Sequence, residues 1–199
     1  MSSGNDDFNV KVLIEGYSFE ENSQYRATGT STLVTGPVNI VVDTGGPWDK
    51  QRLLKALDDN NVKPENIDFV VCTHGHSDHV GNLNLFTNAK HIVGYDINYK
   101  DNYYDHDFKG GKPYPLYKEL VTVIPTPGHM HNDVSVIVHA ANSFGTVAIC
   151  GDLFESQDDE DSWKEFSEWP EEQVKNRDKL KKMATFIIPG HGPMFKVEH

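Results

Sequence analysis

The chain has 199 residues, 37% of them hydrophobic, and carries 18 Lys and Arg against 30 Asp and Glu, a formal net charge of −12. This length and apolar content predict one globular domain over residues 1–199. The acidic balance disfavours broad, nonspecific binding of nucleic acid, because phosphates are held largely by Lys and Arg. It still permits a local basic strip or a metal centre that holds one phosphate.

Signals for the membrane and for secretion are missing from the sequence. No run of about 18 apolar residues occurs, so neither a transmembrane helix nor a membrane partner is expected. The polar, acidic start MSSGNDDFNV lacks the features of a secretory signal. Cys72 and Cys150 each end a short apolar run and are interpreted as buried free thiols. We therefore expect a reducing compartment, the cytoplasm or nucleus.

The first predicted elements are strands. Residues 8–17, FNVKVLIEGY, alternate so that Val10, Val12 and Ile14 share one face of a half-buried strand. Residues 26–46 contain two β-rich runs around a Gly-Pro turn, which is a hairpin signal.

A helix and a buried strand come next. Residues 47–62 begin with proline and place leucines on one stripe, which predicts a helix. Residues 67–74, IDFVVCTH, form a short apolar run typical of a fully buried strand. Residues 80–86 predict a helical turn, and residues 89–95 predict a further strand.

The second half predicts an irregular segment, more strands and one long helix. Residues 98–119 are rich in Gly, Pro and Tyr and predict a loop with short strands that lines a cleft. The later elements are strands at 120–129, 133–141, 144–155 and 185–193, an exposed acidic loop at 158–163 and a helix at 169–184. Strands and helices do not alternate regularly, so a sheet-on-sheet core flanked by helices fits better than a doubly wound sheet.

Seven potential metal ligands follow the predicted strands. Four lie together from the last residue of the strand at 67–74 onward, and three more each follow an apolar run and a glycine. They are His74, His76, Asp78, His79, His129, Asp152 and His191. Glycine lets the backbone turn tightly and approach a centre closely, so four loops can bring these side chains together.

The number of ligands predicts two metal ions. A catalytic zinc takes three protein ligands and a water, so seven ligands make two such sites with one shared carboxylate. His74 and His76 project similarly, whereas Asp78 and His79 lie beyond a turn and can address a second ion. Nitrogen-rich ligation favours two zinc ions, with iron or manganese as alternatives.

The segment THGHSDHVGN resembles the H-x-H-x-D-H signature of the metallo-β-lactamase superfamily. VVDTG, TPGH, CGDLF and PGHGP resemble its other motifs in the same order, over about residues 28 to 195. The resemblance implies an α+β fold, the four-layer αβ/βα sandwich. In that fold two mixed β-sheets face each other, helices lie outside, and metals bind at one edge.

The same resemblance implies a role for each residue. His74, His76 and His129 would hold the first metal, and Asp78, His79 and His191 would hold the second. Asp152 would bridge the two metals, and Asp43 in VVDTG would support the cluster by hydrogen bonding to its ligands.

The implied activity is hydrolysis by two divalent metals. The metals would lower the pKa of bound water, and Asp78 would orient the attacking hydroxide or take its proton. The stretches GDLFE and DEDSW resemble a small animal branch of the superfamily, cytosolic and nuclear, regarded as endoribonucleases of histone pre-mRNA 3′ ends. This implies RNA as substrate and, by analogy, a homodimer.

Other functions stay open. The acidic charge weighs against RNA, and the chain has no room for the extra β-CASP domain of known nuclease branches. A thioester or ester hydrolase like hydroxyacylglutathione hydrolase is the second hypothesis, although TPGHMHND lacks the usual Thr and 199 residues are too few for that enzyme's C-terminal substrate-binding helices. The remaining alternatives are a one-metal iron dioxygenase and a non-enzymatic metal-binding protein.

Three features have two interpretations. His131 either contacts substrate or is a surface group. The tyrosine-rich stretch Tyr103–Phe108 either stacks on bases or serves packing or a dimer contact. The acidic run Asp158–Asp161 is most simply a solvated loop.

Overall fold

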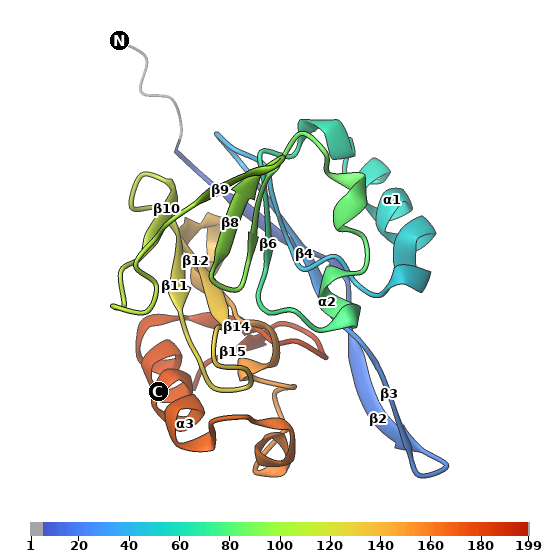
Figure 1. Ribbon diagram of the computed structural model, residues 1–199, viewed down its shortest axis with the longest axis vertical. Coiled ribbons are helices and arrows are strands. Elements are labelled where there is room, and N and C mark those ends of the chain that lie inside the picture. Colours follow the sequence, from blue (N-terminus) through green and yellow to red (C-terminus); the bar gives the residue numbers. More distant parts are fainter. Residues whose placement is uncertain (1–5, 199) are drawn as a thin grey trace.

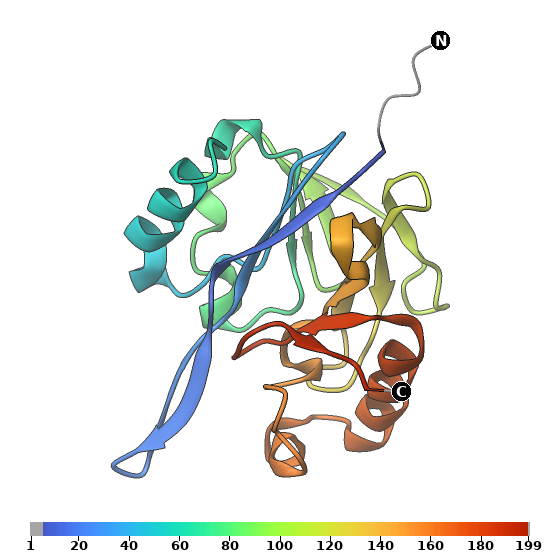
Figure 2. The ribbon, with the colours of Figure 1, turned by 180° about the vertical axis from the view of Figure 1, so that it is seen from behind.

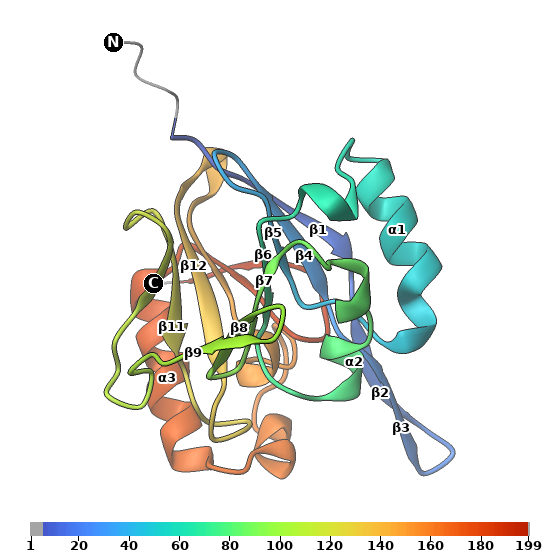
Figure 3. The same ribbon diagram turned by 45° about the horizontal axis from the view of Figure 1, so that its top comes forward.

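The computed structural model describes residues 6–198 and confirms the four-layer αβ/βα sandwich. A seven-stranded sheet and a six-stranded sheet pack face to face, with helix α1 (Lys50–Asp58) outside the first and α3 (Pro170–Met183) outside the second (Figure 1). Figure 3 shows the four layers from a second direction.

The first sheet has the strand order β1-β4-β5-β6-β7-β8-β9. Its strands are β1 (Asn9–Ile14), β4 (Ser31–Thr35), β5 (Ile40–Val42), β6 (Phe69–Cys72), β7 (Lys90–Val93), β8 (Asp96–Tyr99) and β9 (Asn102–Tyr104). The central strands β5, β6 and β7 are parallel, and β5 and β6 are apolar throughout, as expected for strands covered on both faces. Their carboxyl ends therefore meet at one edge.

The second sheet has the order β10-β11-β12-β13-β14-β15. Its strands are β10 (Tyr114–Tyr117), β11 (Val121–Pro125), β12 (Val134–Ala141), β13 (Gly145–Ile149), β14 (Phe186–Ile188) and β15 (Phe195–Lys196). Strand β12 is antiparallel to β11 and β13, and β14 is parallel to β13. Strands β11, β13 and β14 therefore end at the same edge of this sheet.

A two-stranded hairpin, β2 (Tyr17–Glu21) with β3 (Gln24–Thr28), projects from the body of the molecule (Figure 1, Figure 2). The sequence pattern does not distinguish this hairpin from the neighbouring strands. Short helical segments connect the other elements: η1 (Pro47–Asp49), η2 (Pro64–Asn66), α2 (Ser77–Val80), η3 (Leu83–Leu85), η4 (Asn142–Phe144), η5 (Gly151–Leu153) and η6 (Ser162–Phe166).

Three apolar clusters hold the layers together. The largest lies between the sheets, where Val71 of β6 and Val136 of β12 are fully buried. Leu53 of α1 packs on the outer face of the first sheet, and Leu180 of α3 packs on the outer face of the second. Cys72 and Cys150 belong to these outer clusters and are buried free thiols, as predicted.

The predicted facing of the first strand is wrong at one position. Val10 and Val12 face the cluster between the sheets, but Ile14 packs in the outer cluster with α1. The register of β1 against β4 shifts between Val12 and Ile14. Such a bulge inserts a residue and reverses the facing of the residues after it.

No helix in the described part of the chain is long and apolar enough to cross a membrane.

Candidate metal centre

The seven predicted ligands converge at the edge where strands of both sheets end. His74, His76, Asp78 and His79 follow β6, and the other three follow strands β11, β13 and β14 as His129, Asp152 and His191. Parallel strands end at the same edge of a sheet, which explains why loops far apart in the sequence meet here.

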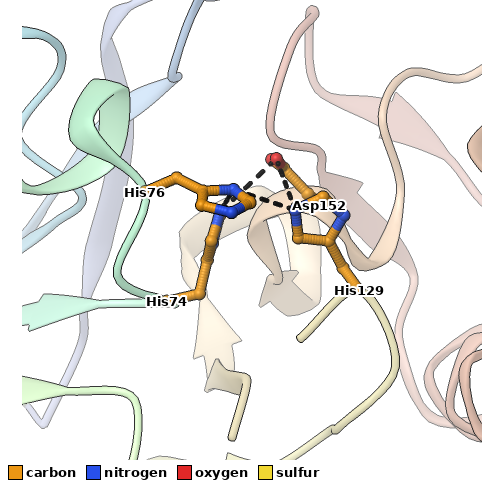
Figure 4. A group of neighbouring side chains, drawn as sticks. All are labelled: His74, His76, His129 and Asp152. Carbon is orange, nitrogen blue, oxygen red and sulfur yellow. Dashed lines mark hydrogen bonds and ion pairs between the residues drawn. The ribbon is translucent and has the colours of Figure 1, made fainter. Parts of the chain in front are cut away.

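One group consists of His74, His76, His129 and Asp152 (Figure 4). The Nδ1 atom of His76 lies 3.0 Å from Nε2 of His74 and 3.1 Å from Nε2 of His129. Oδ2 of Asp152 lies 3.5 Å from Nε2 of His74 and 3.4 Å from Nε2 of His129.

The second group contains Asp78, His79 and His191. Oδ2 of Asp78 lies 3.8 Å from Nε2 of His79 and 3.9 Å from Nε2 of His191. Asp152 joins the two groups, because its Oδ1 lies 3.1 Å from Nε2 of His79 and its Oδ2 lies 3.3 Å from Nε2 of His191.

These distances fit cation binding. Tetrahedral ligands at about 2.0–2.1 Å from a zinc ion lie about 3.3 Å from one another. The contacts within the first group, 3.0 to 3.5 Å, bracket that value. His79 Nε2 and Asp152 Oδ1, which face the centre, are also buried without a hydrogen-bond partner, and such polar atoms are costly unless something binds them.

Outer hydrogen bonds fix the imidazole tautomers. The Thr73 hydroxyl donates its one proton to the Asp43 carboxylate, so its oxygen accepts from Nδ1–H of His74 at 3.1 Å. Nδ1–H of His79 donates to Asp43 Oδ2 at 2.9 Å, and Nδ1–H of His191 donates to the Thr28 carbonyl at 3.0 Å. All three rings therefore direct Nε2 at the centre, and in the neutral tautomer that these bonds select this nitrogen is the one free to bind a metal.

Glycines before two ligands allow the close approach that the sequence analysis expected. Gly151 has a φ of +51°, and a Cβ there would collide with the Thr73 hydroxyl. A Cβ on Gly190 would collide with the carboxylate of Asp152.

Asp152 and the imidazoles around it shift one another's pKa. Burial alone raises the pKa of Asp152, but the imidazoles of His79 and His191 outweigh it and hold that pKa well below its ordinary value. Burial lowers the pKa of His191, and the Asp152 carboxylate reverses this and raises it to about 9. Burial lowers the pKa of His74 well below its ordinary value, so this ring is neutral and ready to bind a cation.

Replacing Asp43 by asparagine should weaken metal binding about 10–100-fold, the usual effect of losing an outer hydrogen bond to a ligand. The amide can accept from the Thr73 N–H as Asp43 does at 2.7 Å. Its NH₂ group would face Nδ1 of His79, forcing the ring proton onto Nε2 and removing a ligand lone pair. Competition with a chelator measures the effect. The control is Asp68→Asn, which changes an exposed carboxylate that accepts from the Asn39 N–H. Unchanged metal affinity in Asp43→Asn would contradict this role.

Helix α3 fixes the loops that carry His129 and Asp152. Gln173 donates to the Asp152 carbonyl at 3.0 Å, and Asn176 donates to the Pro127 carbonyl at 2.8 Å. The His129 carbonyl accepts from the Glu168 backbone at 2.9 Å. Polar side chains on α3 are therefore needed next to the cluster, because their hydrogen bonds hold these loops in place.

The acidic loop is not simply solvated, which corrects the sequence-based expectation. Asp159 is buried and forms two hydrogen bonds with Arg177, at 2.6 and 2.7 Å. The guanidinium lies 4.0 Å from the ring centroid of Phe154 and 4.8 Å from that of Trp163. The buried guanidinium of Arg177 on α3 thus holds the acidic loop against the sheet.

A cavity of about 230 Å³ opens over the cluster. Besides the ligands, it is lined by Glu155, by Tyr25 of the hairpin and by Phe166 of η6. Glu155 lies 3.8 Å from His129 Nδ1, and burial raises its pKa to about 8. Sequence reasoning missed these three residues; Glu155 falls within the quoted GDLFE motif, but no pattern marked the two rings.

The residues with two possible roles, His131 and Tyr103–Phe108, lie away from the cavity over the cluster. His131 pairs with Glu168 at 3.4 Å, contacts Trp169 and lines a different cavity. Tyr103 and Tyr104 line another cavity again, and Phe108 is buried in the core. None of the described residues in these stretches lines the cavity over the cluster.

The turn that carries His129 contains a buried carboxyl, Asp133, whose pKa burial raises to about 8. Between about pH 4 and pH 8 the folded chain therefore keeps a proton that the unfolded chain has released, so raising the pH lowers the free energy of unfolding. Asp133→Asn should remove this contribution and be more stable relative to the parent at pH 8 than at pH 5. Urea unfolding of the metal-free proteins measures it, and equal differences at both pH values would contradict it.

A four-layer sandwich with a buried His and Asp cluster at the strand ends defines the class of metal-dependent hydrolases. The family model described as the metallo-beta-lactamase superfamily matches residues 26–191. The chain belongs to this superfamily.

Similar proteins cover most of the chain. Metallo-beta-lactamase domain-containing protein 1 of Xenopus laevis is 48% identical over 190 residues, 94% of this chain and 81% of the relative. The Homo sapiens protein of that name is 40% identical, over 96% of this chain and 83% of its own. These relatives confirm the resemblance to the animal branch. The crystal structure of a quorum-quenching N-acyl homoserine lactone lactonase, 17% identical, aligns with a TM-score of 0.64 over 96% of this chain and 94% of its own, which shows the shared fold.

Proposed function

We propose that the chain is a hydrolase with two divalent metal ions, most simply zinc, and that it cleaves RNA phosphodiester bonds as an endoribonuclease. The observation that carries the two-metal centre is the position of Asp152. Its two oxygens lie within 3.1 to 3.5 Å of imidazoles from both groups, as a bridging carboxylate requires.

The residues of the cluster form two sets of metal ligands, and one of them, Asp78, also faces the substrate. His74, His76 and His129 would hold one cation, and Asp78, His79 and His191 would hold the other, with Asp152 between them. When bound, such a pair supplies hydroxide near neutral pH and positive charge for the attacked group and the leaving oxygen. Asp78 is 16% exposed and lines the cavity, so its carboxylate faces the space where substrate would bind and could orient the attacking water or take its proton.

RNA as substrate is supported by the resemblance of GDLFE and DEDSW to the animal branch. The reaction itself suits the centre, because paired metals stabilise both the attacking and the leaving oxygen of a phosphodiester. Hydrolysis at histone pre-mRNA 3′ ends is the specific reaction that the resemblance implies.

One observation favours a second candidate, an ester or thioester hydrolase. Neither Lys nor Arg occurs among the described residues that line the cavity over the cluster. A neutral ester would meet less repulsion there than a polyanion.

A substrate panel with the zinc-loaded protein tests the proposal. The panel is a single-stranded RNA, a small phosphodiester, a thioester and a lactone. Cleavage of RNA and of the phosphodiester, lost with a chelator and restored by zinc, is the expected result. Turnover of the thioester or lactone alone would select the second candidate, and metal binding without any turnover would select a non-enzymatic role.

A further inference from the structure

Two aromatic rings from distant parts of the chain meet at the mouth of the cavity over the cluster. Tyr25 on β3 and Phe166 at the end of η6 have ring centroids 5.1 Å apart and planes at 88°. Their side chains remain 59% and 37% exposed. The hairpin and η6 extend from the same end of the molecule (Figure 2). Exposed rings gathered beside a site mark a contact surface.

The rings stand between two cavities. The cavity over the cluster and a second one of about 210 Å³ share Tyr25, Phe166, Glu155 and His191. A substrate that extends from the cluster into the second cavity therefore passes both rings.

Three residues after Tyr25, the chain forms hydrogen bonds with the loops that carry the metal ligands. The Thr28 carbonyl accepts from His191, and the Gly29 N–H donates to the Asp78 carbonyl at 3.2 Å. The Thr30 N–H donates to the Gly190 carbonyl at 2.7 Å. The base of the hairpin is thus positioned by the same loops that carry the ligands.

The charge around the second cavity selects the kind of group that binds there. Its described lining contains the carboxylates of Asp158 and Glu165 but neither Lys nor Arg, so a further phosphate would be repelled. A neutral planar group can lie flat against one ring and present its edge to the other.

We infer that Tyr25 and Phe166 form a stacking subsite for the nucleobase next to the scissile phosphodiester, an inference that rests on the proposed nuclease function. The two rings determine specificity by accepting a base and leaving the adjoining phosphate at the cluster.

Leucine variants of the two rings test the subsite. Tyr25→Leu and Phe166→Leu should raise KM for a uridine dinucleotide about tenfold or more, the usual loss when one stacked base loses its ring. KM for the matching dinucleotide with abasic riboses should stay the same, and Tyr25→Phe should behave as the parent. Tyr103→Leu, which removes an exposed ring in another cavity, is the control. Equal effects on both substrates, or no effect on either, would overturn the subsite.

A binding measurement separates the subsite from the nuclease activity. In calorimetry, the zinc-loaded parent should bind uridine monophosphate more tightly than inorganic phosphate, and Tyr25→Leu should lose that preference. If the parent cleaves no dinucleotide, the nuclease function fails, but this titration still decides the subsite. Equal affinity of the parent for the two ligands would refute it.

Discussion

Asp152→Ala is expected to abolish hydrolysis and to reduce the metal content of the purified protein. Asp152 is the one carboxylate within 3.5 Å of imidazoles from both groups of described ligands. Without it the imidazoles that face its position lose their counter-charge and neither cation keeps a full set of ligands. We expect kcat/KM to fall more than about 10³-fold, beyond the usual effect of losing one transition-state hydrogen bond. Steady-state kinetics with metal analysis measures both quantities.

Asp161→Ala is the matched control for this change. Asp161 is 84% exposed and pairs only with Lys164 among the ion pairs of the described chain, so its removal should leave activity and metal content unchanged. Circular dichroism checks that Asp152→Ala stays folded. Full turnover by folded Asp152→Ala would contradict the bridging role.

Arg177→Met should destabilise the protein by about 3–5 kcal/mol, the usual effect of removing one partner of a buried ion pair. The change leaves the Asp159 carboxylate buried, with the Glu155 N–H at 3.0 Å as its remaining donor. The loop that carries Glu155 and leads to Phe166 should loosen at the same time. Urea unfolding gives the free energy, and protease sensitivity reports on the loop.

A second variant separates the buried charge from the loss of packing. Arg177→Met combined with Asp159→Asn should be more stable than Arg177→Met alone, because no unpaired charge is then buried. Lys175→Ala breaks the surface pair with Glu172 and should leave the free energy of unfolding nearly unchanged. A double variant as unstable as the single one would show that the ion pair is not the cause.

The sequence could predict the layers because their signals are local. The apolar run of β6 and the leucine stripe of α1 each report directly on burial. The ligands were recognisable because each follows a strand end, and parallel strands end together at one edge.

Features that depend on tertiary contacts could not be read in this way. The hairpin β2–β3 is exposed along almost its whole length, so it lacks the alternation that marks a strand. The burial of Asp159 depends on Arg177, 18 residues further along the chain. Tyr25 and Phe166 meet only because the hairpin and η6 lie at the same end of the fold.

Native mass spectrometry of the zinc-loaded protein tests the central claim most directly. Two zinc ions per chain are expected, with the second ion lost in His191→Ala while the first is retained. A parent chain that is fully active with one ion, or that binds none, would contradict the two-metal centre.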